Sequence, residues 1–378
     1  MIKSLNIQAL SDALPRAGLS PAKLAERLGV SREAVSKWLH GESVPQPDKL
    51  LRLGAILGLK FEELVITPVP AAVPIVSFRR KAARKTRDIH LDNARDTREL
   101  LKRLVKYLPE TRLTQAPVLK EPRNDYQYVQ QVAADVRQEM CLARKTVINF
   151  TDLIDMFNRL HAVVVPVLWG DKQHHGNALN IRLPDSSVTW VFLNLDSSVV
   201  DFKFWMAHEL GHALAPTLAG EEAEDFADAF AQALLFPEAN AARLRTTLLS
   251  LAGIGMRVNV IRDEAAKHVI SPLTVRRAIE GYERAKGLDR LALGDEPPFM
   301  GAVKNFSKEY PTVREALLGK DKPGPAEYAA SGRKDFNSPF FDALRAFCKA
   351  ESGAEHFIHQ VLGLPLADSK ALSGELRK

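Results

Sequence analysis

A histidine pair spaced four residues apart stands near the middle of the chain. His208 and His212 belong to the run FWMAHELGH, which covers residues 204–212. On a helix, side chains four residues apart project from one face, so both imidazoles can bind one zinc ion. Glu209 follows the first histidine and is expected to point at the zinc-bound water. The motif predicts a hydrolytic zinc site.

Such a site needs a third protein ligand and leaves the fourth position to water. Residues 224–236 are predicted to form a second helix that Pro237 ends. Its predicted buried stripe consists of Phe226, Phe230 and Leu234. Glu224 and Asp228 stand one turn apart on this helix, a spacing that suits a third ligand and an acceptor for a ligating histidine.

The pattern HELGH followed by E-x-x-A-D-x-F-A-x-x-L-L-x-P resembles the ImmA/IrrE family of metallopeptidases. The resemblance extends upstream to residues 191–194, a strand that ends in Asn, and to residues 201–204, which lead into the zinc helix. It implies a zinc ion bound by His208, His212 and Glu224, with Glu209 as general base.

One position departs from the family pattern. Members commonly carry a second Glu two residues after the first, and here that position holds Phe226. Glu221 and Glu222 therefore remain alternative third ligands beside Glu224.

The ligand set defines the expected chemistry. Zinc held by two neutral imidazoles and one carboxylate keeps a net positive charge and lowers the pKa of its water toward about 7. Glu209 would take the proton as this water attacks a peptide carbonyl, then pass it to the leaving amine. The sequence does not select the group that completes the oxyanion site; the available side chains are His161, His174, His175 and Tyr128. The alternatives are a site that binds zinc without turnover and a surface helix on which His208 and His212 bind nothing.

The N-terminal residues carry a second motif. Ser20 is the expected cap of a helix that Gly29 stops, and Ser31 is the expected cap of the next helix. Two short helices joined by a tight Gly turn form a helix-turn-helix unit. The pattern resembles the Cro/C1-type (XRE) DNA-binding domain over about residues 5–65.

The resemblance places the start of the second helix in the major groove of double-stranded DNA. The exposed positions there are predicted to be Arg32, Glu33, Ser36 and Lys37. Arg32 can read guanine edges, and Ser36 or Lys37 can hold phosphate. The alternative is a helix-turn-helix fold that serves only dimerisation or protein contact.

The expected fold class is mainly α with an α+β peptidase core. Three strands at 162–168, 178–183 and 188–195 lead directly to the zinc helix. The predicted parts are a helix-turn-helix domain at 1–66, a Pro-rich and basic linker with a long helix at 67–123, a zinc metallopeptidase domain at 124–240, a helical subdomain resembling a helix-turn-helix at 241–293 and a C-terminal region without an assigned role at 294–378.

Two linker features leave alternatives open. The basic run at 79–87 could contact phosphate or form a solvated face. The leucine-rich stripe at 100–108 is expected to be either a dimer seam or a packing surface for the peptidase.

Composition narrows the class of protein. The chain has 378 residues, a formal net charge of +6 and two cysteines, Cys141 and Cys348, far apart in sequence. The length leaves room for two or three domains, and the charge favours an anionic partner. We find no apolar run that could span a bilayer, no signal segment and no disulfide framework, so we expect a cytoplasmic protein without a membrane partner. A homodimer is expected.

Three functions remain. The first is a DNA-binding regulatory zinc peptidase that cleaves a repressor- or antitoxin-like protein, or itself, in a stress, prophage or defence response. The second is a transcriptional regulator whose peptidase fold senses zinc or a ligand, or dimerises, without proteolysis. The third is an antitoxin-like partner of a toxin. An intact Glu209 favours the first, because a structural zinc site gains nothing from a base beside the water.

Overall fold

The computed structural model describes residues 4–40, 43, 45, 47–59, 64–66, 97–113, 117–140, 147–170, 177–183, 186, 188–291, 297–319 and 321–378. The predicted Pro-rich spacer, the basic run, Cys141, His174 and His175 lie outside these residues. The chain divides into two compact units, Met1–Val73 and Pro74–Lys378. The stretches predicted at 124–240, 241–293 and 294–378 all belong to the second unit.

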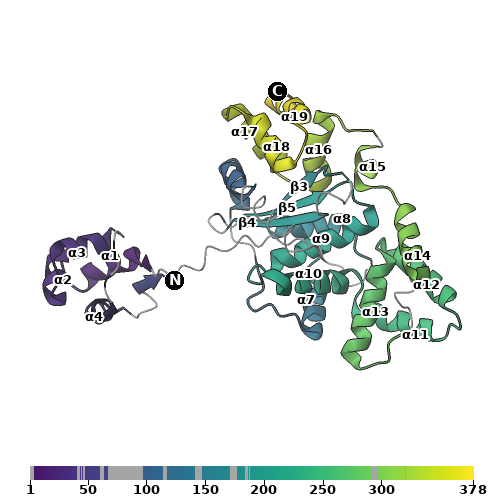
Figure 1. The fold of residues 1–378 in the computed structure, drawn as a ribbon, viewed down its shortest axis with the longest axis horizontal. Coiled ribbons are helices and arrows are strands. Elements are labelled where there is room, and N and C mark those ends of the chain that lie inside the picture. The colour runs from purple at the N-terminus through teal and green to yellow at the C-terminus, as the bar shows by residue number, and fades with distance from the viewer. Residues whose placement is uncertain are drawn as a thin grey trace. The chain divides into compact units, whose positions relative to one another are not determined.

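The first unit is a small helical bundle (Figure 1). Its elements are β1 (Ser4–Leu5), α1 (Ile7–Arg16), α2 (Pro21–Leu28), α3 (Arg32–Leu39), α4 (Pro47–Leu57) and β2 (Val65–Ile66), with β1 antiparallel to β2. The Ser20 hydroxyl accepts from the Lys23 backbone and the Ser31 hydroxyl accepts from the Ala34 backbone, so both predicted caps are confirmed. Gly29 ends α2 in the left-handed conformation, as predicted.

The second unit is built around a three-stranded sheet. Its strands are β3 (Val163–Val167), β4 (Ala178–Leu183) and β5 (Val188–Asn194), which agree with the predicted strands within a residue. β5 is central, parallel to β3 and antiparallel to β4. Asn194, the polar residue that ends β5, accepts from the Trp169 backbone and donates to the Gly170 carbonyl. This side chain therefore ties the segment after β3 to the end of β5.

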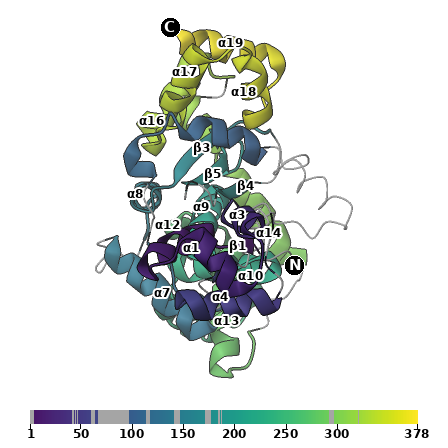
Figure 2. The same ribbon diagram turned by 90° about the vertical axis from the view of Figure 1, so that its left-hand side faces the viewer.

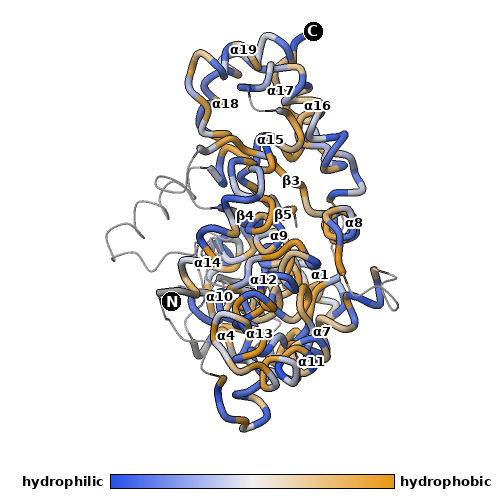
Figure 3. Tube along the Cα trace, turned by 90° about the vertical axis from the view of Figure 1, so that its right-hand side faces the viewer, coloured by the Kyte–Doolittle hydropathy of each residue, from blue (hydrophilic) through white to orange (hydrophobic). Residues whose placement is uncertain are grey.

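One face of the sheet packs on the helices that carry the histidine motif and Glu224. These are α9 (Val199–Leu214) and α10 (Gly220–Leu235), accompanied by α7 (Tyr126–Glu139) and α8 (Phe150–Arg159). Figure 1 shows this layer on one side of the sheet, and Figure 3 shows hydrophobic residues along β3 and α9. The same core extends into α11 (Glu238–Leu249), α12 (Ile254–His268), α13 (Pro272–Lys286), α14 (Pro297–Lys308) and α15 (Val313–Leu318).

The C-terminal helices cover the opposite face (Figure 2). They are α16 (Pro325–Phe336), α17 (Phe340–Ala350), α18 (Ala354–Leu362) and α19 (Leu366–Arg377). Tyr328 and Ser338 donate their hydroxyls to the carbonyls of Pro166 and Val164 on β3. The region for which the sequence indicated no role thus completes the core of the second unit.

The predicted leucine stripe belongs to this second core. Residues 97–105 are helical, and η1 (Glu110–Arg112) follows them. Leu101, Leu104 and Leu108 are buried in the same cluster as α17 and α18. Of the two alternatives for the stripe, the structure supports the packing surface.

The sequence predicted that no segment is long and apolar enough to span a bilayer. None of the helices in the described ranges combines the length and the apolar character that crossing a bilayer requires.

A glycine sets the distance between α9 and α10. A Cβ atom added at Gly211 would lie 3.0 Å from the Ala227 Cα and 3.1 Å from a ring carbon of Phe230. Real Cβ atoms rarely come so close to a neighbouring backbone atom, and Ala227 belongs to a buried helix that cannot shift easily. Gly211 therefore permits the two helices to approach closely.

We predict that Gly211→Val destabilises the second unit by about 1–3 kcal/mol, because the added methyl groups overpack the α9–α10 contact. Thermal unfolding followed by circular dichroism measures the change. The matched control is Gly301→Val in α14, where an added Cβ meets no atom within 4 Å. Equal effects of the two substitutions would contradict the close approach at Gly211.

Candidate metal centre

Helix α9 carries the histidine motif through the middle of the core. Its residues are buried almost all round, as expected of a helix that lies between a sheet and other helices. His208, Glu209 and His212 retain only 1%, 1% and 5% of their exposure. Buried polar side chains require partners, so their surroundings define what this site can bind.

A buried lysine anchors the start of α9. Lys203 Nζ donates to the backbone oxygen of His268, the last residue of α12, at 2.6 Å. It also lies 5.4 Å from the ring centre of Phe150. Burial lowers the pKa of Lys203 to about 8. A cation at the C-terminal end of a helix is a favourable arrangement, and here it ties α9 to α12.

Three predicted ligands lie together at the α9–α10 contact. The Nε2 atoms of His208 and His212 are 3.0 Å apart. Glu224 places Oε2 3.6 Å from His208 Nε2 and Oε1 3.4 Å from His212 Nε2. Two ligands about 2.0–2.1 Å from one tetrahedral zinc are about 3.4 Å apart, so the three groups have the spacing of a zinc site. That they bind zinc stays a prediction.

Asp228 holds the ring of His208 in place. Its Oδ1 atom lies 3.0 Å from His208 Nδ1. A proton on Nδ1 that is donated to this carboxylate leaves the Nε2 lone pair directed at the cluster. Burial also lowers the pKa of His212, which favours the neutral imidazole that metal binding requires.

Glu209 is a buried carboxyl beside this cluster. Within the described residues its Oε2 atom has no hydrogen-bond partner. Burial raises the pKa of Glu209 well above its ordinary value, and the nearby Glu224 carboxylate raises it further. A divalent cation at the cluster would offset the repulsion between the two carboxylates. The donor set and the unpartnered oxygen thus fit a metal with a water molecule beside it.

The structure separates the alternative third ligands from Glu224. Glu221 and Glu222 are exposed at the start of α10 and do not belong to the cluster. Phe226, which occupies the position of the family's second Glu, is buried and stacks on Phe230. The departure from the family pattern therefore adds to the core and leaves the cluster complete with Glu224.

The candidates for the oxyanion site stay unassigned. Tyr128 lies on α7, where the Arg123 guanidinium sits over its ring at 5.0 Å. His161 follows α8 with a positive φ of 54°. Neither belongs to the group of ligand atoms found at the cluster.

Sequence reasoning missed two polar residues of β4. Asn180 is buried, and its amide donates to the Glu209 backbone oxygen at 3.5 Å. Arg182 lines a small hollow together with His212. The alternation of Leu179, Ile181 and Leu183 with Asn180 and Arg182 is a signal that could have placed both polar residues on one face.

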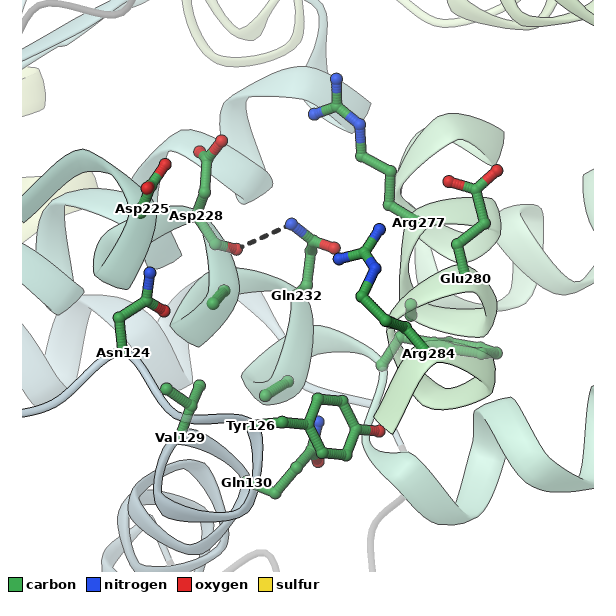
Figure 4. A pocket seen from close by; sticks show the side chains of 15 residues that line it. Asn124, Tyr126, Val129, Gln130, Asp225, Asp228, Gln232, Arg277, Glu280 and Arg284 are labelled. Carbon is green, nitrogen blue, oxygen red and sulfur yellow. Dashed lines mark hydrogen bonds between the residues drawn. The ribbon is translucent and has the colours of Figure 1, made fainter. Parts of the chain in front are cut away.

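A larger pocket of about 590 Å³ lies behind Asp228, between α7, α10 and α13. Figure 4 shows Asp225 and Asp228 on the α10 wall and Arg277 and Arg284 on the α13 wall. Because both acidic and basic side chains line the pocket, its charge does not indicate whether it would bind an anion or a cation.

The predicted DNA-contact residues lie on one exposed stretch of α3. Arg32, Glu33, Ser36 and Lys37 are all exposed, whereas Val35 and Trp38 are buried in the bundle. Lys37 Nζ is 3.0 Å from Glu33 Oε1. Because both side chains are largely exposed, this ion pair holds Lys37 only weakly.

Comparison with known proteins identifies the first unit. Residues 10–64 match the family model described as Helix-turn-helix. Over 55 residues the chain is 46% identical to the "26 kDa repressor protein" of Escherichia phage HK022. The alignment covers 14% of this chain and 23% of that protein, so the chain spans less than a quarter of the relative. No solved structure matches the chain. The N-terminal unit is a helix-turn-helix domain.

We predict that Glu224→Ala reduces bound zinc from one ion to well below one per chain, because the site loses its only carboxylate ligand. Elemental analysis of the purified protein after dialysis measures the ratio. Glu222→Ala removes an exposed acid from the same turn of α10 and should retain the zinc. Full zinc content in Glu224→Ala would require another third ligand.

Proposed function

We propose that the chain is a DNA-binding regulatory zinc metallopeptidase that cleaves a repressor- or antitoxin-like protein, or itself, to control transcription. The observation that carries this proposal is the group formed by the buried His208 and His212 and the half-buried Glu224, with the buried Glu209 carboxyl beside it. A purely structural metal site would not need an unpartnered carboxyl at this position. The resemblance to ImmA/IrrE peptidases points to the same reaction.

The chain's own residues would perform the proton transfers. When bound, zinc would supply a Lewis acid that polarises the scissile carbonyl and makes water more acidic. Glu209 would accept the proton of the attacking water and deliver it to the nitrogen of the leaving amine. Asp228 would keep the His208 ring fixed, with its Nε2 atom directed at the ligand cluster. The surrounding core would exclude other water and strengthen these interactions.

The helix-turn-helix domain supports binding to double-stranded DNA. Its exposed α3 residues are of the types that contact phosphates and base edges, and the chain is basic overall. A DNA-binding domain on the same chain raises the concentration of the peptidase near a repressor bound at the same operator. A protein bound at an operator is therefore the favoured substrate.

A second candidate is a transcriptional regulator that uses the second unit for sensing or dimerisation, without proteolysis. It is favoured by the comparisons, which match the helix-turn-helix segment and include a phage protein described as a repressor. The two candidates differ in whether peptide bonds are cut.

We predict that Glu209→Gln lowers peptide cleavage about 10²–10⁴-fold, because the general base is lost while the shape of the side chain is kept. Wild type and variant, each loaded with zinc, are incubated with a library of peptides prepared from a bacterial proteome, and new termini are counted by mass spectrometry. Zinc content should be the same in both proteins.

Cleavage that is equal in both proteins would remove Glu209 from the mechanism. A wild type that cuts neither the library nor itself, with and without double-stranded DNA, would support the regulator without proteolysis.

We predict that Arg32→Ala with Lys37→Ala weakens DNA binding at least tenfold and makes it less salt-dependent, because a base contact and a phosphate contact are removed. The probe is a duplex selected by the wild-type protein from a random pool, titrated at several salt concentrations. Arg16→Ala with Arg52→Ala removes the same charge from α1 and α4 and should bind nearly as wild type. Equal losses in the two pairs would indicate a nonspecific charge effect and contradict contact through α3.

A further inference from the structure

In the described part of the chain, a small hollow beside His212 is lined by a positively charged side chain and by no acidic one. It is lined by Asn180, Arg182, Thr189, His212, Ala213 and Pro216. Of these six residues, one carries a permanent positive charge and none is an acid. A small space bounded by a metal-ligand candidate and a guanidinium has the charge to receive an anion.

Arg182 is held in this position by the sheet. It lies on β4 directly opposite Thr189 of β5, two residues after Asn180, which contacts the backbone of Glu209. Residues two apart on a strand share a face, so Arg182 and Asn180 lie on the face toward α9. The side chains of Thr189, Ala213 and Pro216, which line the hollow beside the guanidinium, are short.

The Arg182 guanidinium is half-buried. Within the described ranges, the Arg182 side chain makes no hydrogen bond and no ion pair. Burial lowers its pKa, although arginine remains charged at neutral pH. Keeping a charge partly buried without a partner costs free energy that a bound anion would recover.

We propose that Arg182 selects an acidic side chain of the protein substrate near the scissile bond. The inference rests on the proposed peptidase function, because a substrate side chain paired with Arg182 would lie next to the metal-ligand candidates. β4 pairs with β5 alone in the described sheet, so an extended substrate segment has an edge along which to lie. Arg182 would then form a bidentate pair with a substrate Asp or Glu. It is a specificity residue and takes no part in the proton transfers.

A binding experiment tests the proposal without turnover. Labelled hexapeptides are made as pools, one set for each of the six positions. In each pool, one position is fixed as Glu, Gln or Lys and the other positions are random. The pools are titrated against zinc-loaded Glu209→Gln protein by fluorescence anisotropy. At one position the Glu pool should bind about 10–100-fold more tightly than the Gln pool. Arg182→Gln on the same background should abolish the difference, and Arg182→Lys should retain part of it.

Cleavage then separates the two proposals. In wild-type protein, the sites cut in a proteome-derived peptide library should be enriched in Asp or Glu at one position, and Arg182→Gln should remove the enrichment by raising KM for acidic peptides. Cleavage without an acidic preference, or with an equal loss of kcat for all peptides in Arg182→Gln, would overturn the role of Arg182 and leave the peptidase intact. Absence of cleavage in the wild type would overturn the peptidase function, and the binding titration would still decide whether Arg182 recognises an acidic side chain. Thermal unfolding of each variant excludes a loss of fold as the cause.

Discussion

The close packing of α9 against α10 is the constraint on which the candidate site depends. His208 and His212 come from one helix and Glu224 from the other, so the three ligand atoms meet only if the helices nearly touch. Gly211 lies between the two histidine turns and faces Ala227, whose Cα would be 3.0 Å from an added Cβ. The same contact brings Asp228 within hydrogen-bond distance of His208. The glycine and the alanine of the motif are therefore as necessary to the cluster as its ligands.

The rest of the second unit holds these two helices rigidly. The sheet supplies one wall of α9, and Lys203 attaches the beginning of α9 to the end of α12. The C-terminal helices cover the far face of the sheet, and their hydroxyls bond to carbonyls of β3. A buried cluster of two imidazoles and two carboxyls is costly to keep without a counter-charge, and such a packed frame can maintain it. We interpret the large helical surround as the support that the site requires.

The sequence predicted the parts of the structure that local patterns determine. Capping chemistry predicted the helix starts at Ser20 and Ser31. Residue spacing predicted the strand limits around 163–194 and the helix face shared by His208 and His212. Glu224 was predicted because it stands one helical turn before Asp228 and matches the ImmA/IrrE pattern. Arg182 was missed because its proximity to His212 depends on how β4 packs against α9, which no local period encodes. The structural role of residues 325–377 was missed for the same reason. These helices cover one face of the sheet, and the sequence does not show which segments pack on that face.

Anomalous diffraction at the zinc absorption edge shows whether His208, His212 and Glu224 bind one zinc ion. Crystals of the wild-type protein, grown without added metal, should give one strong anomalous peak in the second unit. The peak should lie about 2.0–2.1 Å from the two Nε2 atoms and from an oxygen of Glu224. No peak at this position, with the histidine nitrogens bonded to protein groups instead, would show that these three residues do not form a zinc site.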